Sequence, residues 1–279
     1  MVRVVQLVMG IAGSGKSTYC ECLQEHLSSL KRSAVLVNLD PAAEECFYEP
    51  QIDIRELVSV RDTTEALRLG PNGGLVRCLD LLVREKLGWL REQMDLAGPG
   101  DSEHFVFDCP GQIELYTHIP SFRALVRALR QWGLTVLGSF FIDSVMVLGD
   151  ANKYLSSVML ATSAMVHLEL PWLNVLSKVD LIGAEDQAFY CEVDLEWVRQ
   201  RIEAEAAVRA GTALGRRVSR LNRAVCGLAE SFSMVHFVGL EARNPESLGA
   251  LLEHVDYLTQ YGEDDEPRMA DAAEEEETV

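Results

Sequence analysis

Residues 10 to 17 read Gly10-Ile11-Ala12-Gly13-Ser14-Gly15-Lys16-Ser17, a complete phosphate-binding loop of the G-x-x-x-x-G-K-[ST] type. The glycines let successive backbone N–H groups turn inward on an anion, the lysine reaches the terminal phosphates, and the last serine hydroxyl can bind Mg²⁺. A strand-like run precedes the loop, and Thr18 to Leu30 has the composition of a helix whose N-terminus would face the phosphates. We therefore expect a nucleoside triphosphate to be held by Gly13, Ser14, Gly15, Lys16, Ser17 and Thr18.

The rest of the chain alternates short apolar runs with segments of helical periodicity. The runs expected to be strands are Val4 to Met9, Ala34 to Leu39, His104 to Phe107, Leu134 to Ile142, Trp172 to Leu176 and Met234 to Leu240. Helices are expected around Leu79 to Met94, Phe122 to Leu129 and Leu248 to Val255. This order predicts an α/β fold, a three-layer P-loop NTPase with a mostly parallel sheet of about six strands covered by helices on both faces. Ligands of such sheets bind beyond the carboxyl ends of the strands.

Composition separates a globular part from an acidic end. The net charge is −18, and residues 263–279 contain nine acids and one arginine. We expect residues 1–262 to form one P-loop domain and residues 263–279 to be an acidic disordered tail. Such a charge disfavours direct nucleic-acid binding. The seven cysteines show no C-x-x-C pair, so neither disulfides nor zinc are indicated.

The region from Tyr154 to Leu176 has little charge and contains or adjoins several methionines. Glu169 and Pro171 interrupt it, which argues against a membrane span. Two interpretations remain open. The region is either a buried helix and strand, or it forms a methionine-rich groove for an apolar segment of a partner protein.

The residues after His104 to Phe107 read Asp108-Cys109-Pro110-Gly111-Gln112. In this arrangement Asp108 can hold Mg²⁺ through water, and a glycine N–H can face the γ-phosphate. Gln112 and Glu114 would then flank the attacking water, as orienting groups do in GTPases. Asp, Pro and Gly also form ordinary surface turns, but the position at a strand end after a phosphate-binding loop favours the catalytic interpretation.

Two other predicted strands also end in polar residues. Asp40 follows Ala34 to Leu39 and suits the metal or the water. After Trp172 to Leu176 comes Ser177-Lys178-Val179-Asp180, in which the Asp180 carboxylate can accept two N–H bonds from guanine while the Lys178 stem packs on the ring. Adenine lacks that pair of donors, so GTP is favoured over ATP. GTPases usually have Asn where this chain has Ser177, which weakens the expected support around the loop.

Residues 70 to 74 read Gly70-Pro71-Asn72-Gly73-Gly74, which the chemistry of proline, asparagine and glycine predicts to be a turn. Taken together with the phosphate-binding loop, Asp40-Pro41, the motif from Asp108 and the motif from Ser177, this tripeptide makes the chain resemble the GPN-loop GTPases from end to end. Gly-Pro-Asn is the motif that names that family. Related dimeric ATPases carry an extra lysine at the second loop position, where this chain has Ile11.

The resemblance implies a GTP- and Mg²⁺-dependent dimer whose domain contains a GPN-loop insertion. Each subunit would present Gly70, Pro71 and Asn72 to the partner's nucleotide, with Asn72 in the place of an arginine finger. Asp40, Asn72, Gln112 and Glu114 would be catalytic, and Ser17 and Asp108 would hold the metal. The dimer would form with a GPN-loop paralogue or with a second copy, and it would assist RNA polymerase II assembly and nuclear import.

Two other functions remain open on the residues alone. One is a phosphotransferase that uses the same loop to phosphorylate a small molecule or a polynucleotide end, and the other is a nucleotide-dependent scaffold with negligible turnover. A kinase needs an acceptor pocket and commonly a lid of arginines, which the motifs do not supply. No basic nuclear-localisation run is visible, so we expect a cytoplasmic protein that reaches the nucleus only with a partner.

Overall fold

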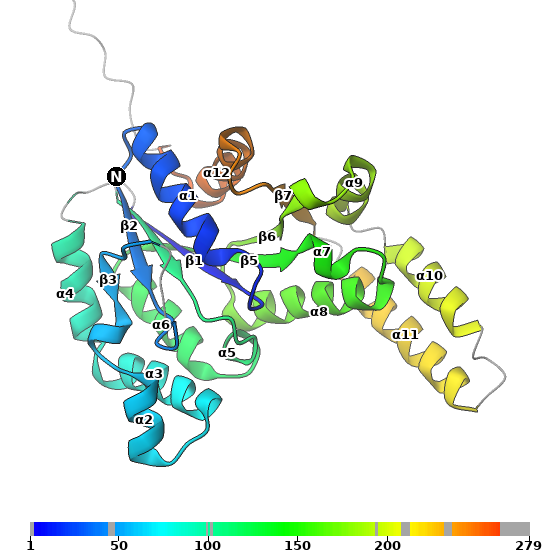
Figure 1. Ribbon diagram of the computed structural model, residues 1–279, viewed down its shortest axis with the longest axis horizontal. Helices are drawn as coiled ribbons and strands as arrows, with labels where there is room; N and C mark the ends of the chain where they lie inside the picture. The colour runs from blue at the N-terminus through cyan, green and yellow to red at the C-terminus, as the bar shows by residue number, and fades with distance from the viewer. Residues whose placement is uncertain are drawn as a thin grey trace, which may run out of the picture.

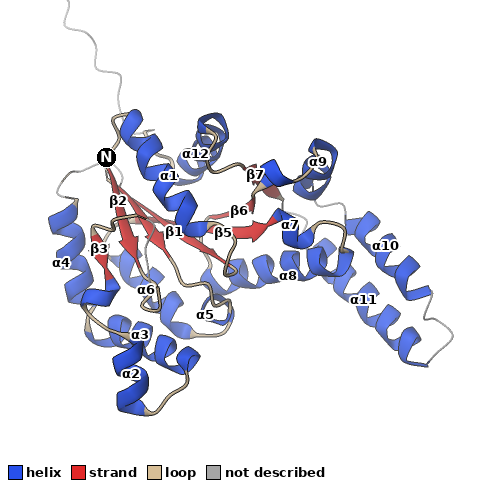
Figure 2. Cartoon of the chain, in the orientation of Figure 1, coloured by secondary structure: helices blue, strands red, loops and turns tan. Residues whose placement is uncertain are grey.

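The structure is a computed structural model that describes residues 3–43, 48–98, 100, 103–192, 195–207, 213–231 and 236–262. Its centre is one sheet whose strands are all parallel in the order β3-β2-β4-β1-β5-β6-β7 (Figures 1 and 2). The strands are β1 Val4–Gly10, β2 Ala34–Asn38, β3 Ile52–Asp53, β4 His104–Asp108, β5 Thr135–Asp143, β6 Trp172–Ser177 and β7 Phe237–Leu240. The predicted α/β class with a mostly parallel sheet is confirmed, with seven strands rather than six.

Helices cover both faces of this sheet, as Figure 1 shows. They are α1 Lys16–Ser29, α2 Val60–Leu67, α3 Pro71–Glu85, α4 Leu87–Ala97, α5 Glu114–Thr117, α6 Pro120–Gln131, α7 Ser144–Val147, α8 Ala151–Leu168, α9 Ala184–Glu192, α10 Leu195–Ala207, α11 Ala213–Ser231 and α12 Pro245–Thr259. Helices α1 and α12 bury side chains such as Leu23 and Leu251 in one apolar cluster. Helices α3, α6 and α8 bury Leu79, Leu125 and Val158 in the larger cluster on the other face. The central strands are therefore apolar on both sides, as parallel strands between helical layers must be.

Two helical pairs extend from the central layers. Helix α2 packs against α3, and α10 and α11 pack against each other and against α8. In Figure 1 the α10–α11 pair projects beyond the sheet. The segment from Tyr154 to Leu176 forms most of α8 and β6, and α8 buries Tyr154, Val158 and Ala161, so its core interpretation is confirmed for that face. None of the described helices is long and apolar enough to cross a bilayer.

Several sequence-based boundaries are wrong. Strand β3 has only two residues, too few for a periodic pattern to reveal it. The expected helix from Leu79 to Met94 is two helices, because Lys86 leaves the helical conformation (φ −127°, ψ 16°) between α3 and α4. Both helices bury the same face, so the apolar periodicity continues across the break. The last strand begins at Phe237, and Met234 lies outside the described residues.

The segment from Gly70 to Gly74 is not a separate turn, which corrects the expectation from its composition. Gly70 is the N-cap of α3, and Pro71 is its first residue, where its fixed φ is favourable and its missing N–H is not needed. Gly74 lies where α3 packs against α2. A Cβ at Gly74 would lie 2.3 Å from Cγ2 of Thr64, so only glycine lets α3 pack this closely on α2.

Among the described cysteines, Cys20, Cys22, Cys78, Cys109 and Cys191 are not in disulfides. Asn244 accepts a hydrogen bond from the Glu246 N–H and so caps α12 ahead of Pro245, as the sequence predicts. The expected boundary between a domain of residues 1–262 and an acidic tail stays a prediction, because residues 263–279 lie outside the described part.

His104 is a buried polar group at the start of the central strand β4, between β1 and β2. Its side chain is 2% exposed, and neither ring nitrogen has a hydrogen-bond partner among the described residues. Burial, with a smaller contribution from the nearby Arg32 charge, lowers the pKa of His104 to about 3. The ring is therefore neutral in the folded protein, whereas an unfolded chain protonates it below about pH 6.5.

We predict that replacing His104 by leucine flattens the pH dependence of stability in mild acid. In mild acid the His104 ring is protonated in the unfolded native chain but stays neutral in the folded protein. As the pH is lowered from 6.5 to 3, His104 therefore reduces the free energy of unfolding by about 1.4 kcal/mol per pH unit. Above pH 7 it has no such effect. Urea unfolding at pH 7 and pH 5 checks this. The native chain should lose about 2 kcal/mol more than His104→Leu over that interval, and parallel losses would contradict the assignment.

Candidate nucleotide-binding and hydrolysis site

The phosphate-binding loop is held between β1 and α1 by its glycines. At Gly10 φ is 140°, and a Cβ there would lie 2.3 Å from the Phe141 carbonyl oxygen of β5. Gly13 and Gly15 have φ of 80° and 82°, the left-handed region that glycine adopts without strain. Gly15 is the N-cap of α1, and the Ser14 N–H donates to the Ile11 carbonyl at 3.2 Å. The loop is thus a tight turn that directs the N-terminus of α1 toward a bound anion.

Lys16 is folded over this loop. Its Nζ donates to the carbonyl oxygens of Gly10 at 3.2 Å and Ile11 at 3.1 Å, and the residue is 8% exposed. Burial lowers the pKa of the ammonium group, while the carboxylates of Asp108 and Asp40 oppose that shift. The positive charge of Lys16 and these two negative charges therefore belong to one electrostatic unit.

A cavity of about 200 Å³ lies beside the loop at the carboxyl ends of β1, β2 and β4. Its lining residues are Ala12, Gly13, Lys16, Ser17, Asn38, Asp40, Ala43, Tyr48, Asp108, Cys109 and Gly111. The structure thus brings together three strand ends that the sequence predicts separately. Burial raises the pKa of Asp108 and of Asp40, and the nearby Asp40 carboxylate raises the pKa of Asp108 further. A cation in this cavity would stabilise both carboxylates in their charged form.

The oxygen donors of this cavity fit Mg²⁺. The Ser17 hydroxyl hydrogen-bonds to the Asp108 carboxylate, so the two expected metal-binding groups point at each other. In the described residues there is no group of three or more His, Cys, Asp or Glu side chains that could hold a metal by itself. Mg²⁺ commonly uses one or two protein oxygens together with phosphate and water oxygens, and Ser17 and Asp108 would supply the protein oxygens here. Bound there, the ion would neutralise negative charge on the phosphates.

Two supporting contacts around this cavity were not predictable from the motifs. The Tyr48 hydroxyl donates to Oδ2 of Asp108 at 2.9 Å, and Tyr48 is buried at the cavity wall. On the side of Asp40, its backbone N–H donates to Oδ1 of Asn38 at 3.0 Å, and the Asn38 amide donates to Asp53 at 3.0 Å. Tyr48 belongs to no spacing pattern, whereas the polar Asn38 at the end of an apolar run was a usable signal.

Gly111 lies against the phosphate-binding loop. A Cβ at this position would lie 2.9 Å from the Ala12 Cα, so glycine is required for the approach. Gln112 and Glu114 follow directly but do not line the cavity. The Gln112 Oε1 is buried and has no hydrogen-bond partner among the described residues. Their expected roles beside the attacking water therefore stay predictions.

A second cavity of about 220 Å³ adjoins the loop on the side of β6 and β7. It is lined by Gly15, Thr18, Ser177, Lys178, Asp180, Leu240, Glu241, Ala242 and Arg243. Three of the expected base-reading positions, Ser177, Lys178 and Asp180, are therefore together. The places of Leu240 to Arg243 in this cavity were not predicted, although Leu240 ends the last expected strand, Glu241 to Arg243 follow it, and the same strand-end rule could have found them.

Ser177 connects the two cavities. Its Oγ lies 2.7 Å from the Ser14 carbonyl oxygen and 3.1 Å from the Ile142 carbonyl oxygen, either of which can accept its proton. The serine therefore supports the phosphate-binding loop despite its difference from the usual asparagine. Lys178, at φ 60°, donates to the Gly13 carbonyl at 2.8 Å and pairs with Asp143 at 2.7 Å. Its stem lies along the second cavity, where the sequence predicts that it packs on the base.

The Gly-Pro-Asn tripeptide is apart from both cavities. Gly70, Pro71 and Asn72 are exposed at the start of α3, and none of them lines either cavity of its own subunit. The structure thus separates Asn72 from Asp40, the other catalytic residue expected near the γ-phosphate.

Comparisons with known proteins agree with this geometry. Residues 8–261 match the model of a family described as "Conserved hypothetical ATP binding protein". The chain is 43% identical over 268 residues to GPN-loop GTPase 3 of Dictyostelium discoideum, covering 96% of this chain and 91% of that protein. It is 41% identical over 281 residues to GPN-loop GTPase 3 of Danio rerio, covering 99% and 94%.

The fold is also known. A crystal structure of a GTPase from Pyrococcus abyssi in apo form matches with a TM-score of 0.72 and 24% identity, covering 93% of this chain and 98% of that one. The segment from Gln260 to Asp264 that leads into the acidic end predicts a similarity to the eukaryotic GPN-loop GTPase 3, which the two relatives confirm. With the identity sustained over nearly its whole length, the chain belongs to the GPN-loop GTPases, the family that its Gly-Pro-Asn tripeptide and phosphate-binding loop predict.

Proposed function

We propose that this GTPase works with Mg²⁺ as a dimeric switch that assists RNA polymerase II assembly and nuclear import. The observation that carries the hydrolysis and dimer parts of the proposal is the arrangement of Lys16, Asp40 and Asp108 around one cavity, with Asn72 outside it. The cavity contains what phosphate binding needs, and the residue expected to complete it lies on an exposed helix start.

The residues of the cavity can be assigned to steps of hydrolysis. The loop N–H groups and Lys16 would bind the β- and γ-phosphates, and Ser17 and Asp108 would hold Mg²⁺. Gly111, packed on Ala12, would place its N–H toward the γ-phosphate. Asp40, Gln112 and Glu114 would orient the attacking water and accept hydrogen bonds from it. The buried, unpartnered Oε1 of Gln112 is an acceptor that such a water could satisfy.

We predict that Gln112→Ala lowers the rate of phosphate release from GTP by about 10²-fold with little change in GTP affinity, because water orientation acts in the transition state. Gln131→Ala, the same change at an exposed position of α6, is the matched control and should be as active as the native chain. Phosphate release from GTP and ATP, with GTP affinity measured in parallel, checks this.

Three other outcomes would contradict parts of this proposal. Equal release from ATP would contradict base selection by Asp180. Release unaffected by Gln112→Ala would contradict the water site. Transfer of the γ-phosphate to an added acceptor without release to water would establish the phosphotransferase instead.

The exposed tripeptide supports a dimer in which Asn72 acts on the partner's nucleotide. Gly74 fixes the start of α3 against α2, so the tripeptide is on a packed helical pair rather than a free loop. A residue supplied in trans can raise the hydrolysis rate by roughly 10³ to 10⁵ when it is an arginine, and an uncharged asparagine should contribute less. The partner would be a GPN-loop paralogue or a second copy of the chain.

Mixing two inactive variants tests this trans role. Asn72→Ala removes the supplied residue, and Lys16→Ala removes the receiving site. We predict that each is inactive alone and that an equal mixture recovers roughly a quarter of the native activity, because random pairing gives half mixed dimers with one complete site each. If size measurements show that mixed dimers have formed but the mixture recovers no activity, the trans role of Asn72 is rejected.

The client and the location rest on family resemblance. Polymerase II subunits are proposed as partners, with no direct contact to nucleic acid or membrane, and the protein is proposed to be cytoplasmic and to enter the nucleus with a partner. The net charge of −18 is consistent with protein rather than nucleic-acid partners.

Depleting the protein from cells should move polymerase II subunits from the nucleus to the cytoplasm. Re-expression of the native chain should restore them, and Lys16→Ala should not, because the proposed switch needs bound nucleotide. Imaging of a polymerase subunit measures both. A normal subunit distribution after depletion would reject the client, and rescue by Lys16→Ala would reject the need for the nucleotide cycle.

A further inference from the structure

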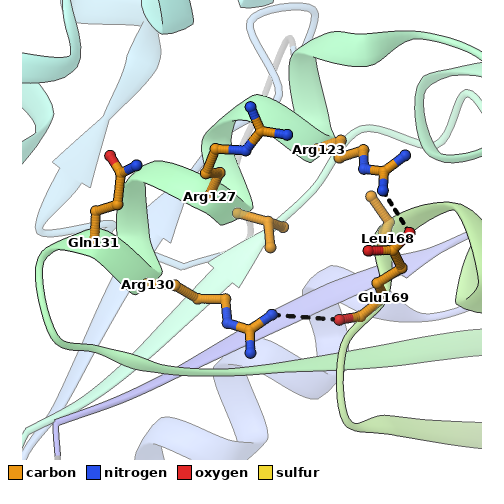
Figure 3. A pocket seen from close by; sticks show the side chains of 7 residues that line it. Arg123, Arg127, Arg130, Gln131, Leu168 and Glu169 are labelled. Carbon is orange, nitrogen blue, oxygen red and sulfur yellow. Dashed lines mark hydrogen bonds and ion pairs between the residues drawn. The ribbon is translucent and has the colours of Figure 1, made fainter.

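Three arginines of α6 surround a cavity of about 300 Å³ that is separate from the nucleotide site. Figure 3 shows Arg123, Arg127 and Arg130 projecting from this one helix, with Leu168 and Glu169 facing them from the end of α8. The buried side chains of Val126 and Leu168 form the apolar part of the lining, and Gln131 completes it. Because α6 precedes β5 and α8 precedes β6, the cavity lies at the edge where the strands begin, opposite the edge that carries the nucleotide site.

The positive charge of this cavity is only partly neutralised. Helix α6 contains these three arginines and no acid. Arg123 forms an ion pair with the Glu169 carboxylate, which is itself exposed. Arg130 reaches only the Glu169 backbone carbonyl, at 3.5 Å, and Arg127 has no ion pair or hydrogen bond with any described residue. Two exposed guanidinium groups, each with several free N–H donors, are therefore available to carboxylates.

The chain contains a segment of matching chemistry. Residues 263–279 contain nine acids and one arginine, and Glu274 to Glu277 form an unbroken run of four carboxylates. Residues 1–262 contain 34 acids and 24 lysines and arginines, a net charge of −10, so most of their surface repels such a segment. A helix face with three arginines and no acid attracts it, and arginine pairs with carboxylates through two parallel hydrogen bonds.

The described residues that lead into that segment, Asp256 and Tyr261, lie at the same edge of the sheet as the cavity. Helix α12 follows β7 and so returns to the edge where the strands begin. Its end is fixed there by Arg32, two residues before β2, which pairs with Asp256 at 2.7 Å and covers the Tyr261 ring at 4.0 Å. Crossing from this face to α6 means passing two helical layers and the sheet, roughly 30 Å. Glu274 and Glu277 are 12 and 15 residues beyond Gly262, and extended chains of these lengths span up to about 40 and 50 Å, so the run can reach the arginines.

We propose that the Glu274 to Glu277 run of the acidic segment docks in cis on the arginine face of α6, with Arg127 and Arg130 as its main partners. The tether makes the contact intramolecular, so its effective concentration is of millimolar order and weak, exposed ion pairs are sufficient. The contact does not depend on the proposed hydrolysis mechanism, because none of these residues lines the nucleotide cavities.

Photo-crosslinking in the full chain tests this contact. The chain carries p-benzoylphenylalanine in place of Ala273, next to the run of glutamates, and is irradiated in low salt. We expect cross-links to peptides of α6 or to the end of α8. Reversing the charge of the face with Arg127→Glu and Arg130→Glu should reduce them at least about fivefold, and 0.5 M NaCl should do the same because salt screens exposed charges. The matched control is Arg217→Glu with Arg220→Glu, the same charge change at exposed positions of α11.

Irradiating a mixture of isotopically heavy and light chains distinguishes cross-links within one chain from cross-links between two chains. Cross-links within one chain that the α6 reversal removes and the α11 reversal preserves would support the proposal. It would be overturned by cross-links confined to other elements, by cross-links between heavy and light chains only, or by cross-links to α6 that survive its charge reversal. An equal loss in both double variants would also overturn it, because the effect would then be one of total charge.

Discussion

The close contact of β1 and β5 at Gly10 is the constraint on which the nucleotide site depends. A side chain at Gly10 would collide with the Phe141 carbonyl at 2.3 Å, so glycine alone lets the phosphate-binding loop leave β1 this near to β5. From there, Ser177 at the end of β6 reaches the Ser14 carbonyl at 2.7 Å. The phosphate cavity and the second cavity are thus parts of one hydrogen-bonded unit rather than two neighbouring pockets.

This unit contains several charged side chains that lose contact with water when the protein folds, which is unfavourable for their charged forms. Lys16, Asp40 and Asp108 line one cavity. Burial lowers the pKa of Lys16 and raises the pKa of the two aspartates, so it favours the neutral form of each group. A triphosphate with its magnesium ion brings charges of both signs that suit this arrangement, so the site is organised for a ligand and not for its own stability. The hydrogen bond from Tyr48 holds the Asp108 carboxylate in place from outside the motifs.

Much of the fold was predictable because it repeats one pattern. Apolar runs that end in Asp40, Asp108 and Ser177 gave strands, and parallel strands place their ends at one edge. The errors have local physical causes. The break at Lys86 leaves the apolar face of α3 and α4 continuous, and β3 is two residues long. The Gly70 to Gly74 segment begins a helix at Pro71, and Gly74 packs closely against Thr64 of α2. No local pattern contains that packing.

By itself the sequence determined the phosphate-binding loop, the α/β class, the strand-end carboxylates and the family, because each is a short-range pattern of residue types. Only the tertiary structure decided which distant residues meet: Tyr48 on Asp108, Ser177 on Ser14, and Leu240 to Arg243 beside Asp180. It also decided that Asn72 lies outside its own nucleotide cavities and that three arginines of α6 face the end of α8. Such pairings depend on strand order and helix packing, which bring together residues that are far apart along the chain and share no spacing rule.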